Sequence, residues 1–165
     1  MRATIHNGRT SHLGAFTPKH NDRSFNISHA EHIDPERVKL NRYWNWTGKE
    51  ITFEDAERAF YEKHIRQHLD AQNARYKAQR HAERVKSMDE YRRSPQTCPE
   101  EVILQIGKLG DTIPADMMAR IIQEQINWEQ KQFPGVKVLN VALHMDEQGA
   151  PHIHERRAWI YTDKD

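Results

Sequence analysis

The chain has 165 residues, of which 36% are hydrophobic, which suits one domain with a single core spanning residues 1–165. Its one cysteine, Cys98, excludes an internal disulfide and fits a reducing cytoplasm, where we expect the protein to act. No apolar run approaches the length of a membrane span and no signal peptide is recognisable, so the sequence predicts neither a membrane segment nor secretion. The net charge of +1 favours no class of partner by itself.

The first 49 residues are modestly basic and rich in aromatic side chains. They hold eight Lys or Arg against four acidic residues. Lysine and arginine neutralise phosphates and aromatic rings stack on bases, so this composition favours a surface for single-stranded DNA. The alternative is that the rings fill the core. The rings are those of Phe16, Phe25, Tyr43, Trp44 and Trp46.

The middle of the chain, from Phe53 to about Arg93, predicts one long polar helix. Thr52 offers an N-cap, the stretch contains no Gly or Pro, and Ser94-Pro95 ends it. Apolar positions are sparse, so most of the helix faces solvent or a partner. Its basic side chains could contact a DNA backbone, although a charge-rich helix is usually only a solvated surface. These side chains are Arg66, Arg75, Lys77, Arg80, Arg84 and Lys86.

Four further elements follow this helix. Residues 101–107 predict a strand, residues 114–132 a helix, and residues 136–144 and 152–161 two more strands. The full order is strand, irregular segment, long helix, strand, helix, strand, strand. This order predicts an α+β fold in which helices pack against one face of an antiparallel sheet.

The last two strands predict a hairpin that gathers three histidines. Residues 148–151, Gln-Gly-Ala-Pro, supply its turn. Because strand side chains alternate between faces, His152 and His154 project from the same face. A suitable register adds His144 from the opposite strand. Three neutral imidazoles with open positions suit a divalent cation such as Mn²⁺, Zn²⁺, Ni²⁺ or Co²⁺.

A less specific interpretation of this hairpin is that its histidines are solvated polar residues. The chain holds 11 histidines, so some gather by chance. The acidic pair Asp146 and Glu147 beside the first histidine favours the metal site, because carboxylates serve as additional ligands or orient the imidazoles. The sequence therefore predicts a metal site on the C-terminal hairpin.

Three segments along the chain carry a family resemblance. Residues 20–23, His-Asn-Asp-Arg, follow a Gly-containing stretch that begins at Leu13. Residues 32–43 run from a histidine through Asp-Pro-Glu-Arg to Asn-Arg-Tyr, and residues 144–154 combine a histidine, Asp-Glu and Pro-His-Ile-His. In this order the segments resemble the three motifs of the plasmid mobilisation relaxases of the Mob/Pre (plasmid recombination enzyme) family, a branch of the HUH endonucleases.

The resemblance implies a palm-like antiparallel sheet and a metal-dependent enzyme. Such enzymes nick single-stranded DNA of a plasmid or mobile element at a specific site and transfer the strand through a covalent protein-DNA link. We expect Mn²⁺ or Mg²⁺ in function, with Zn²⁺, Ni²⁺ or Co²⁺ as alternatives. His144, His152 and His154 would hold the metal and Glu147 would take part in catalysis. The expected DNA contacts are Lys19, Asn21, Arg37, Asn41 and Arg42.

The nucleophile implied by the resemblance is the histidine of the first motif, His20. Arg23 would bind the phosphate and the charge that grows on it. Many HUH enzymes use a tyrosine instead, which makes Tyr43 the second choice. A second His-Asn-x-Arg element, residues 6–9, competes for the role, although a turn with polar flanks explains it better.

The chain departs from the family pattern in two ways. The spacing from His144 to His152 is one residue longer, and a glycine in the turn can absorb the extra residue. The chain ends at Asp165, where family members continue, so we expect a catalytic domain truncated at its C-terminus. Two rival functions stay open: a DNA-binding module without catalysis, and a metal-dependent phosphodiesterase that uses water.

Overall fold

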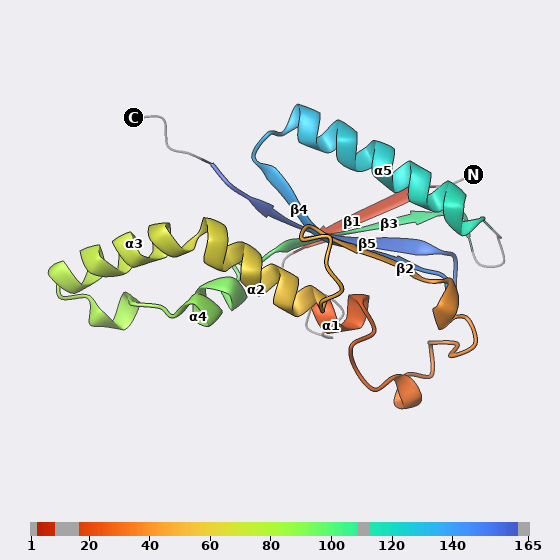
Figure 1. The fold of residues 1–165 in the computed structure, drawn as a ribbon, viewed down its shortest axis with the longest axis horizontal. Coiled ribbons are helices and arrows are strands. Elements are labelled where there is room, and N and C mark those ends of the chain that lie inside the picture. The colour runs from red at the N-terminus through yellow and green to blue at the C-terminus, as the bar shows by residue number, and fades with distance from the viewer. Residues whose placement is uncertain (1–2, 9–16, 109–112, 162–165) are drawn as a thin grey trace.

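The computed structural model describes residues 3–8, 17–108 and 113–161, and the first of these ranges by its backbone alone. Its centre is a five-stranded sheet in the order β1-β3-β5-β4-β2, with every neighbouring pair antiparallel (Figure 1). The α+β architecture predicted from the sequence is therefore confirmed. The strands are β1 (Ala3–Gly8), β2 (Arg42–Asn45), β3 (Glu100–Ile106), β4 (Val136–His144) and β5 (His152–Trp159).

Strands β4 and β5 form the predicted hairpin, and β5 lies between β3 and β4. Their register places His144 opposite His152 and Ala142 opposite His154. Gly149 in the connecting loop has a φ of +144°, a conformation that side chains rarely tolerate. The glycine thus lets the longer loop close the hairpin in this register.

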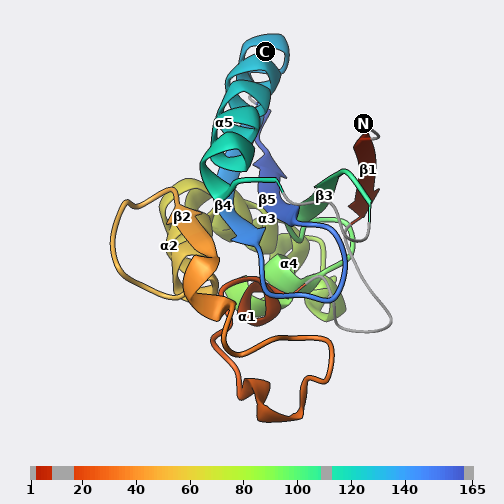
Figure 2. The same cartoon turned by 90° about the vertical axis from the view of Figure 1, so that its right-hand side faces the viewer.

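Helices cover both faces of the sheet, which corrects the expectation of one covered face (Figure 2). Helix α5 (Ala115–Gln132) packs Met118 and Ile122 against a core cluster that includes Ile153 of β5. Helix α2 (Phe53–His64) packs Phe60 into a second cluster with Leu139 of β4. Residues of a central strand alternate between the two faces, so each face presents apolar side chains that need a cover.

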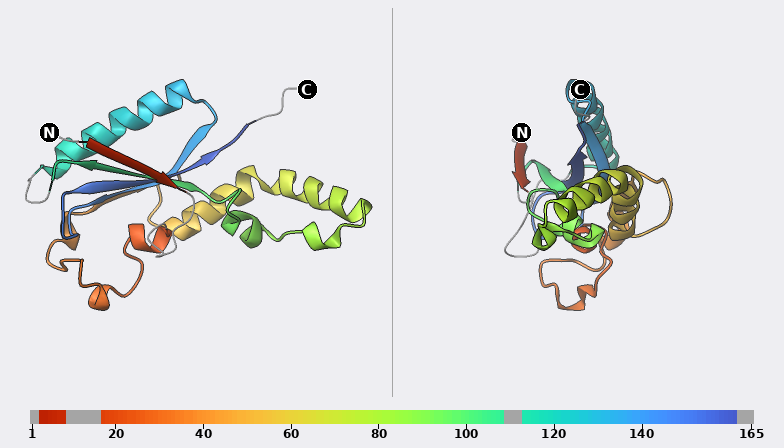
Figure 3. Two further views of the ribbon diagram at one scale, coloured as in Figure 1. Left: turned by 180° about the vertical axis from the view of Figure 1, so that it is seen from behind. Right: turned by 90° about the vertical axis from the view of Figure 1, so that its left-hand side faces the viewer.

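The prediction of one continuous helix over residues 53–93 is wrong. The segment consists of α2, α3 (Arg66–Ala78), a short 3-10 turn (Ala82–Arg84) and α4 (Met88–Arg93). Arg80 adopts a left-handed φ of 62°, which ends the helical path and turns the chain back. The result is a helical arm that projects from the sheet (Figure 3).

The motif-bearing segment between β1 and α2 is mostly irregular, as expected, with one short strand that the sequence did not predict. It contains α1 (Pro18–Asn21), the 3-10 turns Ile27–His29 and Val38–Leu40, and the edge strand β2. Thr17 caps α1, since its hydroxyl accepts a hydrogen bond from the amide of His20. None of the described helices combines the length and apolar character that crossing a membrane requires.

Candidate functional site

The three hairpin histidines meet on the face of the sheet that α1 and α2 cover. The ring centroids lie 5.3 Å apart for His144 and His152, 4.7 Å for His144 and His154, and 5.0 Å for His152 and His154. Alternation along β5 sends Ile153, between the two histidines, into the core under α5. Strand β5 therefore supplies two of the three imidazoles and the apolar packing behind them.

Each of these imidazoles has one ring nitrogen anchored by a protein oxygen. His154 Nδ1 lies 2.6 Å from Glu101 Oε1, His144 Nε2 lies 2.8 Å from the carbonyl oxygen of Asn21, and His152 Nδ1 lies 3.2 Å from that of Ala150. The second nitrogen of His154, Nε2, is buried and has no hydrogen-bond partner among the described residues. Imidazoles that bind metals show this pattern, because the outer partner fixes the ring and leaves the inner nitrogen for the cation.

His20, more than a hundred residues earlier in the chain, joins the cluster. Its ring centroid lies 5.7 Å from that of His144 and 5.5 Å from that of His154. One donor atom from each of His20, His144, His154 and Glu147 falls within 4.8 Å of the others, a spacing that can hold a metal ion. His152 lies just outside this group, with its Nε2 3.4 Å from Glu147 Oε2. The geometry thus adds His20 to the predicted set and places His152 at its margin.

Glu147 lies at the centre of the cluster. Its Oε1 is 3.3 Å from His20 Nε2 and 3.2 Å from His144 Nδ1. Burial alone would raise the pKa of Glu147, but hydrogen bonds from His144, His20 and Arg23 outweigh it and hold the pKa far below its usual range. The group is therefore a carboxylate throughout the physiological pH range.

Two of the hairpin imidazoles, those of His152 and His154, are held in the form that binds cations. Burial lowers the pKa of His152 to about 4, assisted by the neighbouring His154 and His144. Burial also lowers the pKa of His154, against the opposing influence of Glu101. Neutral imidazoles at pH 7 keep a free lone pair, which is what a metal ion requires.

Arg23 links the first motif to the hairpin. Its Nε and Nη2 each lie 2.9 Å from a carboxylate oxygen of Asp146, its Nη2 lies 2.7 Å from Glu147 Oε1, and its Nη1 donates to the carbonyl oxygen of His20. The side chain is only 4% exposed. The guanidinium therefore orients the cluster from within the protein, and the expected role of Arg23 in binding phosphate stays a prediction.

The second motif holds the hairpin loop in place. The amide of Asp34 donates to the carbonyl oxygen of Asp146 at 2.7 Å, and the amide of Gln148 donates to that of His32 at 2.9 Å. An isolated bridge pairs Ile33 with Glu147. These contacts fix the backbone on both sides of Glu147, so its carboxylate enters the cluster in a defined direction.

The predicted DNA-contacting residues divide into buried and accessible ones. Asn21 is fully buried and its amide donates to Glu101, while Asn41 is buried between the hydroxyl of Tyr43 and the amide of Met145. Neither asparagine reaches solvent to meet DNA, so both act as parts of the scaffold. Lys19, Arg37 and Arg42 are accessible, and Lys19 pairs with Glu54 at 3.5 Å.

Sequence reasoning missed Glu101, which is fully buried beneath the cluster. It accepts from His154 and also pairs with Arg156 at 2.9 Å, and Arg156 in turn pairs with the buried Glu57 of α2. A carboxylate next to Val102, on a strand that enters a core, needs a buried partner. The signal was therefore present in the sequence, in the acidic start of the predicted strand.

The alternative nucleophiles have other contacts or lie partly outside the described structure. The hydroxyl of Tyr43 accepts a hydrogen bond from Asn41 at 3.0 Å, and its ring packs edge-on against Phe53. In the 6–9 element, residues 6–8 belong to β1 by their backbone, and Arg9 lies outside the described residues. The stretch from Leu13 to Phe16, which precedes the first motif, also lies outside them.

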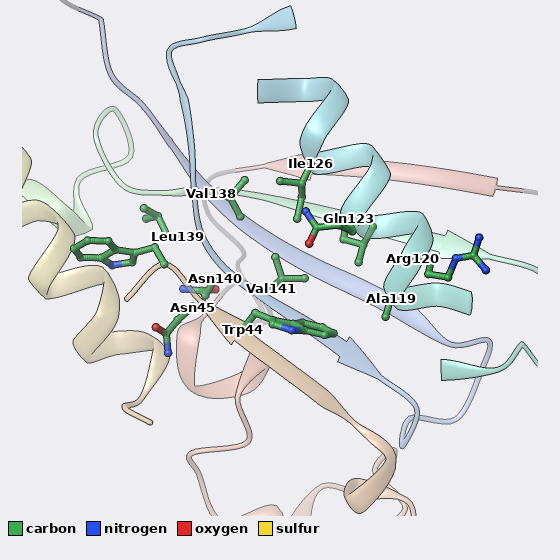
Figure 4. Close-up of a pocket in the computed structure, with 12 residues that line it drawn as sticks. Trp44, Asn45, Ala119, Arg120, Gln123, Ile126, Val138, Leu139, Asn140 and Val141 are labelled. Atoms are coloured by element: carbon green, nitrogen blue, oxygen red, sulfur yellow. The ribbon is translucent and has the colours of Figure 1, made fainter. Parts of the chain in front are cut away.

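The N-terminal aromatics divide between the core and the surface. Trp46 packs against Phe60 and donates its indole N–H to the carbonyl oxygen of Ala56, whereas Trp44 on β2 is 43% exposed. Trp44 lines a groove of about 410 Å³ between β2, β4 and α5, into which Gln123 also points (Figure 4). This groove lies on the α5 side, so the sheet separates it from the histidines.

No protein-family model matches the sequence, and no curated protein sequence matches it either. Solved structures do match, and they establish the fold as that of a relaxase domain of the Mob/Pre type, as the motif resemblance implied. The matched structures are of the MobM relaxase domain (MOBV; Mob_Pre), Mn-bound and in complex with oriT DNA of plasmid pMV158.

The similarity extends over nearly the whole chain at low sequence identity. The complex with 22-nucleotide DNA and a 3′-thiophosphate gives a TM-score of 0.59 at 16% identity, covering 94% of this chain and 69% of that one. A complex with 23-nucleotide DNA gives a TM-score of 0.57 at 13% identity, covering 98% of this chain and 70% of that one. The fold is thus retained where most residues differ.

Proposed function

We propose that this protein is a metal-dependent relaxase, which nicks single-stranded DNA of a plasmid or mobile element at a specific site and transfers the strand through a covalent histidine-DNA intermediate. The observation that carries the proposal is the meeting of His20 with the hairpin cluster. A histidine from the first motif and two from the third place their donor atoms within 4.8 Å of one another around Glu147. A structural core has no need of four polar groups converging in this way.

The residues present fit a divalent metal. His144, His154 and Glu147 would hold it, with His152 as a further ligand, and the anchored outer nitrogens would keep the rings in place. Mixed imidazole and carboxylate ligands suit Mn²⁺, the metal of the similar MobM structures, as well as Mg²⁺ and Zn²⁺. When bound, such a cation polarises a phosphate oxygen and offsets the charge that develops on it.

In this proposal His20 supplies the nucleophile. A ring nitrogen forms a bond to phosphorus with its lone pair while one P–O ester bond breaks, and the departing oxygen takes up a proton to become a free hydroxyl end. The attached ring releases its remaining N–H proton to solvent. Attack needs the nitrogen about 3–3.5 Å from phosphorus, so Glu147, 3.3 Å from His20 Nε2, would orient the ring. The phosphoramidate retains the energy for the reverse joining step.

The accessible basic residues near the site would guide the DNA. Lys19 lies next to His20 on α1, and Arg42 lies at the exposed edge strand β2. We propose that these two and Arg37 contact phosphates, whereas the exposed rings of Tyr43 and Trp44 stack on bases. The substrate would then reach the site along the β2 edge, in the cytoplasm of a cell that carries the mobile element.

One observation favours a second function. Because His20 belongs to the group that can hold a metal, it could serve as a ligand, and water would then attack the phosphate. The protein would in that case be a phosphodiesterase without a covalent intermediate. The two functions differ in one measurable product, the covalent protein-DNA adduct, which only the relaxase forms.

Trapping a protein-DNA adduct separates the two functions. The protein is incubated with Mn²⁺ and labelled single-stranded oligonucleotides that tile the transfer origin of its own mobile element, and the products are run on a denaturing gel. We expect a labelled adduct that is destroyed by acid, is lost in His20→Ala and persists in Tyr43→Phe. Cleavage without an adduct would establish the phosphodiesterase. An acid-stable adduct in His20→Ala would identify another nucleophile.

A further inference from the structure

The helical arm concentrates the positive charge of the chain at its tip. Residues 71–87, the end of α3 and the turn that follows it, hold five Lys or Arg and one acidic residue. The rest of the chain holds 20 basic and 23 acidic residues, so it is net negative. The basic residues of this arm tip are Arg75, Lys77, Arg80, Arg84 and Lys86.

Three of the five charges at the arm tip form no ion pair among the described residues, whereas Arg84 Nε lies 3.7 Å from Glu83 Oε1 and Lys86 Nζ donates to Ser94 Oγ at 3.3 Å. Within the described residues, no salt bridge within 4.0 Å reaches Arg75, Lys77 or Arg80, and all three are exposed. Arg66, at the base of the same helix, differs because its Nε lies 2.9 Å from Glu62. Leu69 is the one buried residue of α3. The outer half of the arm therefore presents cations that the protein itself does not neutralise.

Arg80 occupies the position after a helix end where glycine would make the fold more stable. The amide of His81 donates to the carbonyl oxygen of Tyr76 and that of Arg80 to Lys77, which is the Schellman pattern at a helix end. The residue in this position must adopt a left-handed φ, here 62°. Glycine reaches this conformation without strain, whereas arginine does not. A cationic side chain at this position costs stability, and no ion pair with another described residue compensates for it.

We propose that the arm tip binds the phosphate backbone of double-stranded DNA flanking the nick site. This inference rests on the proposed function, because it takes DNA as the substrate. Duplex DNA carries a charge about every 1.7 Å, twice the density of a single strand, so it suits a surface that offers charge alone. The arm tip has one aromatic residue, the half-buried Tyr76. One ring is not enough to stack on the successive bases of a single strand.

The length of the arm suits contact outside the catalytic site. Helices α2 and α3 hold 12 and 13 residues, which at 1.5 Å each rise about 37 Å, close to one turn of duplex. The base of α2 lies beside the site, since the Phe53 amide donates to Asp22, next to the first-motif asparagine. Figure 1 shows the arm leading away from that point. Duplex DNA beside the nick would therefore lie along the arm while the single strand enters the cluster.

The salt dependence of binding tests this inference. Affinity is measured between 50 and 300 mM salt for a hairpin duplex and a single strand of equal length, with the wild type and the triple variant Arg75→Gln, Lys77→Gln, Arg80→Gln. Each lost phosphate contact reduces the slope of log K against log salt by about 0.9, so we expect a decrease of about 2 to 3 for the duplex. The single-strand slope should stay unchanged. Equal slopes for both proteins, or an equal decrease on the single strand, would overturn the inference.

Two matched variants exclude a structural explanation. Arg66→Gln removes a cation of the same helix that is already paired, and should leave the duplex slope unchanged. Arg80→Gly should raise the melting temperature while weakening duplex binding, a combination that a merely structural arginine would not give. The adduct assay stays independent: the triple variant should form as much adduct as the wild type at saturating DNA. Loss of binding to vesicles of anionic lipid with no change on duplex DNA would point to a membrane instead.

Discussion

The guanidinium of Arg23 and the carboxylate of Asp146, 123 positions apart in sequence, face each other through two hydrogen bonds of 2.9 Å. Neither side chain is exposed beyond 4%. The pair joins the segment that carries His20 to the loop that carries Glu147. It therefore determines whether His20 and the hairpin histidines share one site.

A double-mutant cycle measures this coupling. Arg23→Ala and Asp146→Ala should each lower the free energy of unfolding by on the order of 3 kcal/mol, because each leaves a buried charge without its partner. The double variant should lose about as much as one single variant, which corresponds to a coupling energy of about 3 kcal/mol in urea unfolding. Additive losses would show that the two side chains act independently.

Metal binding should stabilise the fold. Mn²⁺ at a hundred times its dissociation constant should raise the free energy of unfolding by about 2.7 kcal/mol, seen as a higher melting temperature that EDTA reverses. His154→Ala, His144→Ala and His152→Ala should reduce this increase. His68→Ala, an exposed histidine on α3, is the control and should keep it. A full increase in His154→Ala would place the metal elsewhere.

Glu101 should act as a positioning residue for His154. Glu101→Gln keeps the shape of the side chain but weakens its hold on the imidazole, so we expect Mn²⁺ affinity to fall about 10- to 100-fold in calorimetry. Glu100→Gln is the matched control. Glu100 is next to Glu101 on β3 but on the opposite face of the strand, where it contacts Arg157 and Trp159. Equal affinities for the two variants would contradict this role.

Stability should decline from mildly acidic to near-neutral solution because of Glu155. Burial on the α5 side, next to Glu129 and Glu100 and opposed only by Arg157, raises its pKa to about 8. A raised pKa in the folded state stabilises the fold fully below the unfolded value and loses this contribution as pH rises through about 8. The free energy of unfolding should therefore fall between about pH 5 and 8 and level off above this range. Glu155→Gln should flatten this dependence, and an unchanged slope would assign it to another group.

The regular elements with strong periodicity were predictable from the sequence. The hairpin strands and the helix before them have the expected bounds within two residues, because alternation and apolar spacing are local properties. The division of the long helix was partly visible as well. Ser87 and Glu90 form a capping box, a sequence pattern that marks the start of a new helix at Met88.

The partners of the site residues were not predictable in the same way. His20 and His144 could be named from their motifs, but the contact between Asn21 and Glu101 joins residues 80 apart, and nothing local specifies it. The short strand β2 was missed for the same reason, since four residues gain strand character only by pairing with β4. The acidic partners of Arg23 could not be predicted either, because they come from a distant loop.

The place of β5 in the sheet has a consequence for biosynthesis. It follows every other described strand in the chain, yet it pairs with both β3 and β4. Until β5 leaves the ribosome, the pair β1-β3 and the pair β4-β2 have no strand to connect them, and pairing across such sequence separations is slow. Two of the hairpin histidines arrive with that same strand. The nascent chain thus remains without its histidine cluster until the sheet closes.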